Sequence, residues 1–400
     1  MILRSRLPVV FILLTLVIDA MGVGLILPVM PELIKSVAGG DLANAAIWGG
    51  VLATVFAVMQ FLFGPVLGGL SDRFGRRPVL LVSMATIALD YVVMALAGTL
   101  WLLFLGRLVG GILAATQSIA AAFMADISRP EDKAANFGLL GAAFGVGFVL
   151  GPLVGGLMAT FGPRAPFYAA AALAALNFAI GLFVLPETVT QSNRRRFNWR
   201  RSNPFGVFKH LGKLPDVSRL LLLFFLYEFA FFVYPAVWAY FTLERFGWTP
   251  QMVGISLASF GVSIAIVQGL LIRKVLAWFG TRGTVVFGLL FSAIAFFVLA
   301  ILQDGFLALM FTPFSALGVV VTPALQSMAS SRVGDDQQGE LQGAITSVRA
   351  VAVILSPLVM TQTFALFTRN EAMYLPGAPF LLSLGIMAIC MVVFLTRRRG

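Results

Sequence analysis

Five ionisable side chains lie within stretches of the sequence that are otherwise apolar. They are three acids and two arginines: Asp19, Asp90, Glu228, Arg107 and Arg349. A charge at the centre of a membrane helix costs about 2.5 to 3.5 kcal/mol, so we expect these groups to face a protein interior or a wet cavity. A carboxyl group in such a place suits proton transport, because burial favours its neutral form while a nearby arginine or water favours its charged form.

The depths of these groups predict which of them meet. Counted along a helix, Asp19 and Arg107 lie at nearly the same level in the membrane, so they could form a pair; the alternative is that the backbone satisfies each of them locally. Glu228 and Arg349 also lie at similar depths and could face each other. We predict that the three acids couple protons and that the two arginines are their charge partners, although a purely structural role stays open for any single group.

Polar and aromatic side chains in the same apolar stretches are candidates for contacts with a substrate. A cavity lined by aromatic rings with few polar groups suits an amphipathic organic molecule. The alternative is that such rings face lipid or the membrane surface. The predicted substrate-contacting residues are Gln60, Tyr91, Gln117, Tyr227, Phe231, Tyr234, Trp238 and Gln268.

A polar turn, residues 68–78, separates two of the apolar stretches. Its glycines allow close backbone approach, and its arginines favour the cytoplasmic side of a bilayer. Asp126, at the inner end of a later stretch, is placed to pair with Arg76 or Arg73. We predict a conformational latch, or alternatively an ordinary surface ion pair, formed by Gly68, Asp72, Arg73, Gly75, Arg76 and Asp126.

Small residues mark two further stretches as close-packing helices. After Arg107 they recur on one predicted face, at Gly110, Gly111, Ala114, Ala115 and Ser118. The stretch 136–160 offers a glycine stripe with an internal proline, suited to sliding against a partner helix. Its marker residues are Gly141, Gly145, Gly151, Pro152, Gly155 and Gly156.

The chain contains internal repeats at one spacing. Residues 74–77 (Phe-Gly-x-Arg) recur about half a chain later at residues 279–282, and residues 150–154 match residues 355–359 at the same offset. Such pseudo-symmetry is typical of secondary transporters. We predict a six-helix bundle over residues 1–186, a basic cytoplasmic linker over 187–218 and a second six-helix bundle over 219–400.

The composition predicts an integral membrane protein. Hydrophobic residues make up 60% of the chain and charged residues 11%, with a mean hydropathy of +0.96, which is far more apolar than a soluble domain. A span needs about 20 apolar residues. We predict an all-α protein with twelve spans, at about 7–34, 46–69, 79–98, 100–126, 136–160, 165–185, 219–243, 251–275, 283–302, 305–329, 339–367 and 375–396.

The distribution of positive charge predicts the orientation. If the N-terminus starts inside, most of the 28 Lys and Arg residues fall on the inner side, and those on the outer side are Lys35, Arg164, Arg245 and Arg369. Positively charged segments stay in the cytoplasm, so both termini are predicted to be cytoplasmic. The first apolar run is too long for a secretion signal and is predicted to be the first span. The basic run at 194–196 is expected to meet anionic lipid, with nucleic acid as the weaker alternative.

The sequence contains no pattern typical of an enzyme. The single cysteine, Cys390, and the single histidine, His210, form no metal-binding or catalytic pattern, and there is no Walker loop. We expect no metal and no cofactor, with the proton gradient as the energy source. We also expect a monomer that contacts protons, lipids and a lipophilic small molecule, and no nucleic acid.

The chain resembles the major facilitator superfamily over nearly all of its 400 residues. The motifs that carry the resemblance are residues 68–78, residues 107–111 and residues 141–156, and residues 19–31, 89–91 and 244–248 are similar to the tetracycline efflux branch of its drug/proton antiporters. The resemblance implies a rocker-switch fold and proton-coupled export. That branch is expected to have a histidine in span 8 and an aspartate in span 9, where this sequence has Ile264 and Ser292, so the charges that would meet a cationic metal chelate differ.

We therefore predict a proton-coupled antiporter of the bacterial inner membrane that exports lipophilic or amphipathic drugs, tetracycline-like compounds among them, by alternating access. A symporter or facilitator for a specific metabolite would share the fold and differ in the direction of transport. A receptor or scaffold without transport is the third interpretation, and the charges within the membrane argue against it.

Overall fold

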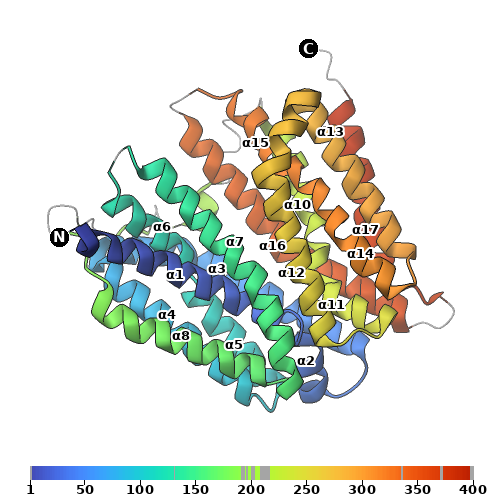
Figure 1. The fold of residues 1–400 in the computed structure, drawn as a ribbon, viewed down its shortest axis with the longest axis horizontal. Coiled ribbons are helices and arrows are strands. Elements are labelled where there is room, and N and C mark those ends of the chain that lie inside the picture. Colours follow the sequence, from blue (N-terminus) through green and yellow to red (C-terminus); the bar gives the residue numbers. More distant parts are fainter. Residues whose placement is uncertain are drawn as a thin grey trace. The chain divides into compact units, whose positions relative to one another are not determined.

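The computed structural model is all-helical over the residues that it describes. These are residues 2–129, 131–190, 194, 197–199, 203–207, 217–334, 337–369 and 373–396. Figure 1 shows them as helices joined by loops, and no strand occurs among them. An apolar chain folds this way in a membrane because a helix satisfies its backbone hydrogen bonds within one segment. The predicted all-α class is confirmed.

The helices follow one another with short connections. The N-terminal part contains α1 (Ile2–Ile26), α2 (Met30–Ala38), α3 (Leu42–Phe74), α4 (Arg76–Leu96), α5 (Leu100–Leu113), α6 (Thr116–Ile127), α7 (Lys133–Met158), η1 (Ala159–Phe161), α8 (Ala165–Val184) and η2 (Pro204–Val207). The C-terminal part contains α10 (Ser218–Phe231), α11 (Val233–Phe246), α12 (Pro250–Ile266), η4 (Val267–Leu271), α13 (Ile272–Ile301), α14 (Gly305–Ser315), η5 (Ala316–Val320), α15 (Val321–Ser330), α16 (Gln338–Arg369) and α17 (Ala378–Leu395).

Among the described residues, 11 helical segments are long and apolar enough to cross a membrane. One of them, Pro250–Ile301, has 52 residues, or about 78 Å of helix, which is more than twice the ~30 Å thickness of the hydrocarbon core. Within it Gly280 leaves helical geometry, with φ 63° and ψ 175°, a conformation open to glycine. The break lies between the predicted spans 251–275 and 283–302. The count of twelve spans and the cytoplasmic orientation of the termini stay predictions.

Some predicted spans are interrupted helices. The first divides into α1 and α2, and the fourth divides into α5 and α6 at Ala114 and Ala115. The prediction of one continuous small-residue face after Arg107 is therefore wrong, because the backbone leaves helical geometry at Ala114 (φ −75°, ψ 55°). The eighth and tenth predicted spans also change pitch, with a π-helical turn at η4 and a 3-10 turn at η5.

The described residues group into two compact units. The first holds Met1–Gly39, Val55–Pro204 and Pro250–Ala258, and the second holds Gly40–Thr54, Phe205–Thr249 and Ser259–Gly400. In the first unit α1 packs against α7 and α8, and α4 packs against α5 and α8 (Figure 1). In the second unit α13 packs against α17, and α10 packs against α16 and α17. The predicted division at a 187–218 linker stays a prediction, and much of that linker lies outside the described residues.

Each unit has its own apolar core. In the first, Phe11, Ile12 and Leu16 of α1 are buried with Met84 and Phe123. In the second, the largest fully buried side chains include Phe241, Phe296, Phe364 and Phe380. Each such aromatic side chain buries about 150 to 250 Å², so these rings contribute strongly to the stability of the core.

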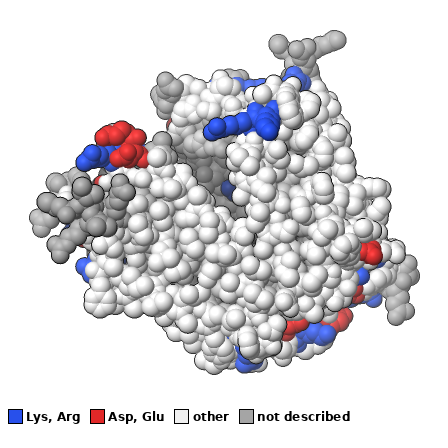
Figure 2. Space-filling model, viewed as in Figure 1, with Lys and Arg blue, Asp and Glu red and all other residues white. Residues whose placement is uncertain are grey.

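Large apolar side chains also cover the exterior of the helices. Trp101, Phe183 and Trp278 are among many that are exposed. On the face shown in Figure 2, Lys, Arg, Asp and Glu gather in a few places and most of the surface consists of uncharged residues. An exterior of this kind would aggregate in water and suits contact with lipid.

Glycines on α7 bring its backbone against α1. A Cβ atom added at Gly151 would lie 2.5 Å from the carbonyl oxygen of Met21, and Gly147 and Gly155 face α1 equally closely. No side chain fits between backbones at such distances. Gly141 and Gly145 of the predicted stripe have nothing within 4 Å of an added Cβ, so the stripe that contacts α1 begins at Gly147, four residues before Gly151.

The α1–α7 contact predicts a position-specific effect on stability. We expect Gly147→Leu to lower the stability of the protein by about 1 to 3 kcal/mol, because the added side chain overpacks a backbone contact. The midpoint of thermal unfolding in detergent micelles measures the effect. Gly145→Leu on the same helix is the control and should leave the midpoint unchanged; an equal loss in both variants would contradict the contact.

Candidate functional site

Asp90 and Arg107 form an ion pair inside the first unit. Asp90 lies on α4 and Arg107 on α5, and Nη2 of the arginine contacts Oδ2 of the aspartate. Their side chains are only 5% and 11% exposed, respectively. The Arg107 guanidinium also lies 5.1 Å from the centre of the Phe56 ring, within cation–π range. The charge of the arginine is therefore balanced inside an apolar region.

The expected pair between Asp19 and Arg107 is wrong. Counting residues gives the depth of a side chain but not the direction in which it points, and α5 presents Arg107 to Asp90 on the neighbouring α4. Asp19 takes part in none of the ion pairs found among the described residues. The side chains that line a cavity with Asp19 are uncharged, some of them polar and some apolar.

Two glycines of α5 make room for the Asp90 carboxylate. A Cβ atom added at Gly106 would lie 2.9 Å from Oδ1, and one added at Gly110 would lie 2.7 Å from Oδ2. Real Cβ atoms do not approach oxygen this closely, so any side chain here would displace the carboxylate. Gly110, predicted as part of a packing face, thus gives Asp90 access to Arg107.

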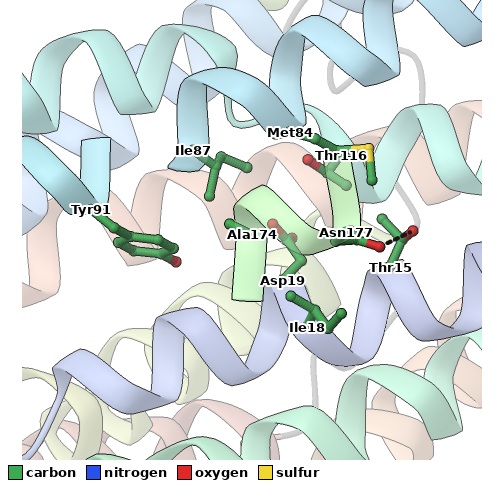
Figure 3. Close-up of a pocket in the computed structure, with 9 residues that line it drawn as sticks. All are labelled: Thr15, Ile18, Asp19, Met84, Ile87, Tyr91, Thr116, Ala174 and Asn177. Carbon is green, nitrogen blue, oxygen red and sulfur yellow. Dashed lines mark hydrogen bonds between the residues drawn. The ribbon is translucent and has the colours of Figure 1, made fainter. Parts of the chain in front are cut away.

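Asp19 lines a small cavity between α1, α4, α6 and α8. Figure 3 shows the lining residues, which are Thr15, Ile18, Asp19, Met84, Ile87, Tyr91, Thr116, Ala174 and Asn177. The Thr15 hydroxyl lies 3.2 Å from Oδ1 of Asn177, within hydrogen-bond distance. The Tyr91 hydroxyl approaches α1 so closely that a Cβ atom at Gly22 would collide with it. Asp19 and the predicted Tyr91 therefore share one cavity, and Asn177 joins them.

Glu228 and Arg349 form a second pair, within the second unit. Nε of Arg349 lies 3.3 Å from Oε2 of Glu228, and the Thr322 hydroxyl donates to Oε1 at 3.2 Å. The Glu228 side chain is 8% exposed and that of Arg349 is 63% exposed. The predicted contact between these two residues is present, while their roles in transport stay predictions.

The aromatic residues predicted to contact substrate lie in the core of the second unit. Tyr227, Tyr234 and Trp238 are buried and Phe231 is half-buried. The Tyr234 ring centre lies 5.0 Å from that of Phe260, within a larger set of ring contacts. In this arrangement these rings contact one another, so their contact with a substrate stays a prediction.

The three predicted glutamines are exposed. Gln60 on α3 donates to the carbonyl oxygen of Ala114 at 3.1 Å, a group left free where α5 ends and α6 has not yet begun. Gln117 follows the same break, and Gln268 lies in the π-helical turn η4. Turns of that kind often occur at functional sites, so the prediction for Gln268 stands.

Three of the predicted latch residues, Asp72, Arg76 and Asp126, meet at the start of α4. Nε of Arg76 lies 3.2 Å from Oδ2 of Asp126, and its Nη1 lies 2.5 Å from Oδ1 of Asp72. Arg73 instead lies over the Phe74 ring, 5.0 Å from its centre. The expected partner of Asp126 is thus Arg76, and the latch role stays a prediction.

Glu187 completes this cluster and was not predicted. Its carboxylate accepts from the backbone N–H groups of Arg76 at 2.9 Å and of Arg77 at 3.3 Å, which are among the unpaired donors at the start of α4. Its Oε2 fills the space beside Gly75, whose φ of 113° suits glycine. The next residue, Thr188, donates to Asp126 at 3.1 Å.

The sequence carries a signal for only some of the site residues that were not predicted. Asn177 is a lone amide in the apolar helix α8, and a polar residue within a span is a functional signal by default. Thr15 and Thr116 carry no such signal, because a hydroxyl can bond to its own helix. Glu187 follows the last turn of α8, where an acid looks like an ordinary loop residue.

A family model, sequence relatives and a solved structure were each found to be similar to this chain, and all of them are similar over most of its length. The family model of the Major Facilitator Superfamily matches residues 12–357. The chain is 39% identical to tetracycline resistance protein class C of Escherichia coli over 91% of each chain, and 35% identical to the class B protein of Escherichia coli over 95% of this chain and 92% of that protein. A solved structure of the nucleoside transporter NupG is 13% identical, with a TM-score of 0.79 over 96% of this chain and 98% of that one, and this likeness concerns the fold alone.

The glycine contact with Asp90 predicts the effect of one added methyl group. We expect Gly110→Ala to separate Asp90 from Arg107 and to lower stability by about 3 kcal/mol, the lower end for breaking a buried ion pair. Thermal unfolding in micelles measures this loss. Gly64→Ala in α3, where an added Cβ meets nothing within 4 Å, is the control, and a stable Gly110→Ala variant would contradict the proposed contact.

The bonds from Glu187 predict a local effect at α4. We expect Glu187→Ala to weaken the first turn of α4 by about 1 kcal/mol, as for loss of a helix cap. Amide hydrogen exchange at Arg76 and Arg77, followed by mass spectrometry, should become faster. Asp132→Ala is the control, because Asp132 precedes α7 without a side-chain cap bond; unchanged exchange in Glu187→Ala would remove the capping role.

Proposed function

Because the chain belongs to the major facilitator superfamily, we propose that it is a proton-coupled antiporter that exports lipophilic small molecules by alternating access. The observation that carries this proposal is the placement of three acids within apolar helices. Asp90 is paired with Arg107 and Glu228 with Arg349, whereas Asp19 faces a cavity and has no ionic partner in the part of the chain that the structure describes. Such groups are rare within spans and mark ion pathways.

The three acids are suited to different tasks. Protonating Asp90 would leave Arg107 charged and unpaired at 11% exposure, and an unpaired buried charge is strongly destabilising. Asp19 has no such partner among the described residues, so a proton there removes a charge and leaves none behind. We infer that Asp19 is the main proton carrier and that the two pairs hold the helices in register. Glu228 is intermediate between these two cases as a proton carrier. Its partner Arg349 is largely exposed, so water can stabilise the arginine when Glu228 is protonated.

Alternating access would switch Asp19 between its protonated and its charged form. While Asp19 is closed off from water, its neutral form is favoured, and when the cavity opens to water the charged form becomes favourable and the proton is released. Proton entry from outside and release to the cytoplasm then drives export of the second substrate. We infer that the latch formed by Asp72, Arg76 and Asp126, with Glu187, holds one of the two conformations.

The relatives narrow the class of substrate. Two similar proteins are tetracycline resistance proteins, so a tetracycline or another lipophilic drug is the first compound to test. Ser292, at the position expected to be acidic in that branch, is buried against Gly318 and carries no charge. This supports a substrate that needs no acid there, and so a neutral or weakly charged compound over a cationic metal chelate.

The remaining features of the proposal follow from the family and the sequence. The helices that can span a membrane and the bacterial relatives indicate a multi-pass protein of the bacterial inner membrane. We infer that it performs no enzymatic reaction and uses the proton gradient without a bound cofactor, because its sequence holds no nucleotide-binding or hydrolytic motif. We also infer that it works as a monomer in contact with lipid.

Transport in proteoliposomes with an imposed pH gradient tests the proposal. We expect Asp19→Asn to abolish efflux driven by the gradient, because an amide cannot carry the proton. For Asp90→Asn we expect a loss of stability of about 3 to 5 kcal/mol, because this change leaves the buried Arg107 without its ionic partner. Glu228→Gln should lose less stability, because the arginine that it leaves unpaired, Arg349, is largely exposed and water can solvate its charge.

Controls make the result decisive. Glu131→Gln changes an exposed acid and should leave efflux unchanged. Unchanged gradient-driven efflux in Asp19→Asn would remove the proton assignment. Flux directed inward with the proton gradient would identify a symporter, and no flux of any tested drug would favour a role other than export.

A further inference from the structure

The cavity beside Asp19 contains polar groups without hydrogen-bond partners. Oγ1 of Thr116 is buried and has no hydrogen-bond partner among the residues that the structure describes, and the residue is 2% exposed. Asn177 is 3% exposed and its Oδ1 accepts from the Thr15 hydroxyl, while its amide nitrogen carries two N–H donors. Figure 3 shows Asp19, Thr116 and Asn177 around the same space. An apolar cavity stays dry, but one lined this way offers the two to four partners that a buried water molecule needs.

The size of the cavity fits one water molecule. Its volume is about 10 Å³, near the lower limit for a single water. A drug-sized molecule is far too large for it, and an anion would be repelled by a charged Asp19. The lining therefore selects a small molecule that can both donate and accept hydrogen bonds.

The interruption of span 4 adds a favourable field. Helix α6 begins at Thr116, two residues after the break at Ala114, so its first N–H groups have no acceptor within the helix. The start of a helix carries a partial positive charge, and transporters place such interrupted helices at their ion sites. A negative charge on Asp19, and a water molecule that donates to it, are both favoured beside Thr116.

We propose that this cavity binds one water molecule, held by the Asp19 carboxylate, Thr116 Oγ1 and the Asn177 amide, and that this water brings the proton to Asp19 and takes it away. The role of this water in transport rests on the proposed function, whereas the existence of the water site does not. Tyr91 is the other titratable group in the lining, and its hydroxyl is directed to α1 at Gly22. Asp90 and Arg107 are paired with each other on the α5 side of α4.

Two variants remove the water ligands with little change of volume, namely Thr116→Val and Asn177→Leu. Ser83→Ala is the matched control, because Ser83 on α4 is also a buried hydroxyl without a partner but does not line the cavity. A high-resolution structure of the wild type should contain one water within hydrogen-bond distance of Asp19 and Thr116, and that of Thr116→Val should lack it. An empty wild-type cavity would overturn the proposal.

Carbodiimide labelling of the protonated Asp19 carboxyl, followed by peptide mass spectrometry over a range of pH, gives a second readout that needs no transport. We expect the midpoint of labelling to rise by about one pH unit in Thr116→Val and in Asn177→Leu, because each variant loses the water that donates a hydrogen bond to the charged carboxylate. The Ser83→Ala midpoint should not move. An unmoved midpoint in Thr116→Val, or an equal shift in Ser83→Ala, would overturn the proposal. If efflux by the wild type does not depend on the pH gradient, the proposed function is wrong. That result would not contradict the water site.

Discussion

The high cost of placing charge in an apolar region determines how the ionisable groups of this protein are arranged. A charged side chain in a span is tolerated only when it is paired, solvated or neutral, and two of the three acids are paired. Arg107 is neutralised by Asp90, Arg349 neutralises Glu228 while remaining largely exposed, and Asp19 faces a cavity whose other lining residues are uncharged. The helices around these groups are built to provide those contacts, with Gly106 and Gly110 admitting a carboxylate where any larger residue would exclude it.

Small residues serve two distinct purposes in the first unit. On α7 they bring one backbone against another at α1, and on α5 they open space for a carboxylate. The first use removes side chains from a contact, so no change of rotamer can absorb a displacement between the two helices. α1 and α7 are therefore expected to move together as one body, with the proton-carrying Asp19 fixed to it.

The sequence was sufficient for the features that depend on hydropathy and depth. The apolar stretches predicted the helices, and depth along α10 and α16 predicted the meeting of Glu228 and Arg349. Depth failed for Asp19, because two residues at one level need not point toward each other. The break at Ala114 was missed because no proline marks it, and small residues at helical spacing look like one continuous packing face. Glu187 was missed because its partners are backbone N–H groups more than a hundred residues away, which no side-chain pattern reveals.

The two internal ion pairs also determine how the membrane potential acts on the protein. Each pair is neutral as a unit, so moving it through the electric field does no net work, and the state of Asp19 alone changes the charge of the region around the cavity. If an uncharged compound leaves as one proton enters, each cycle transfers one positive charge inward, and about 2.3 kcal/mol per 100 mV of voltage adds to the pH difference. Export of a neutral compound would then continue in a cell whose cytoplasm has the same pH as its surroundings, as long as its interior stays electrically negative.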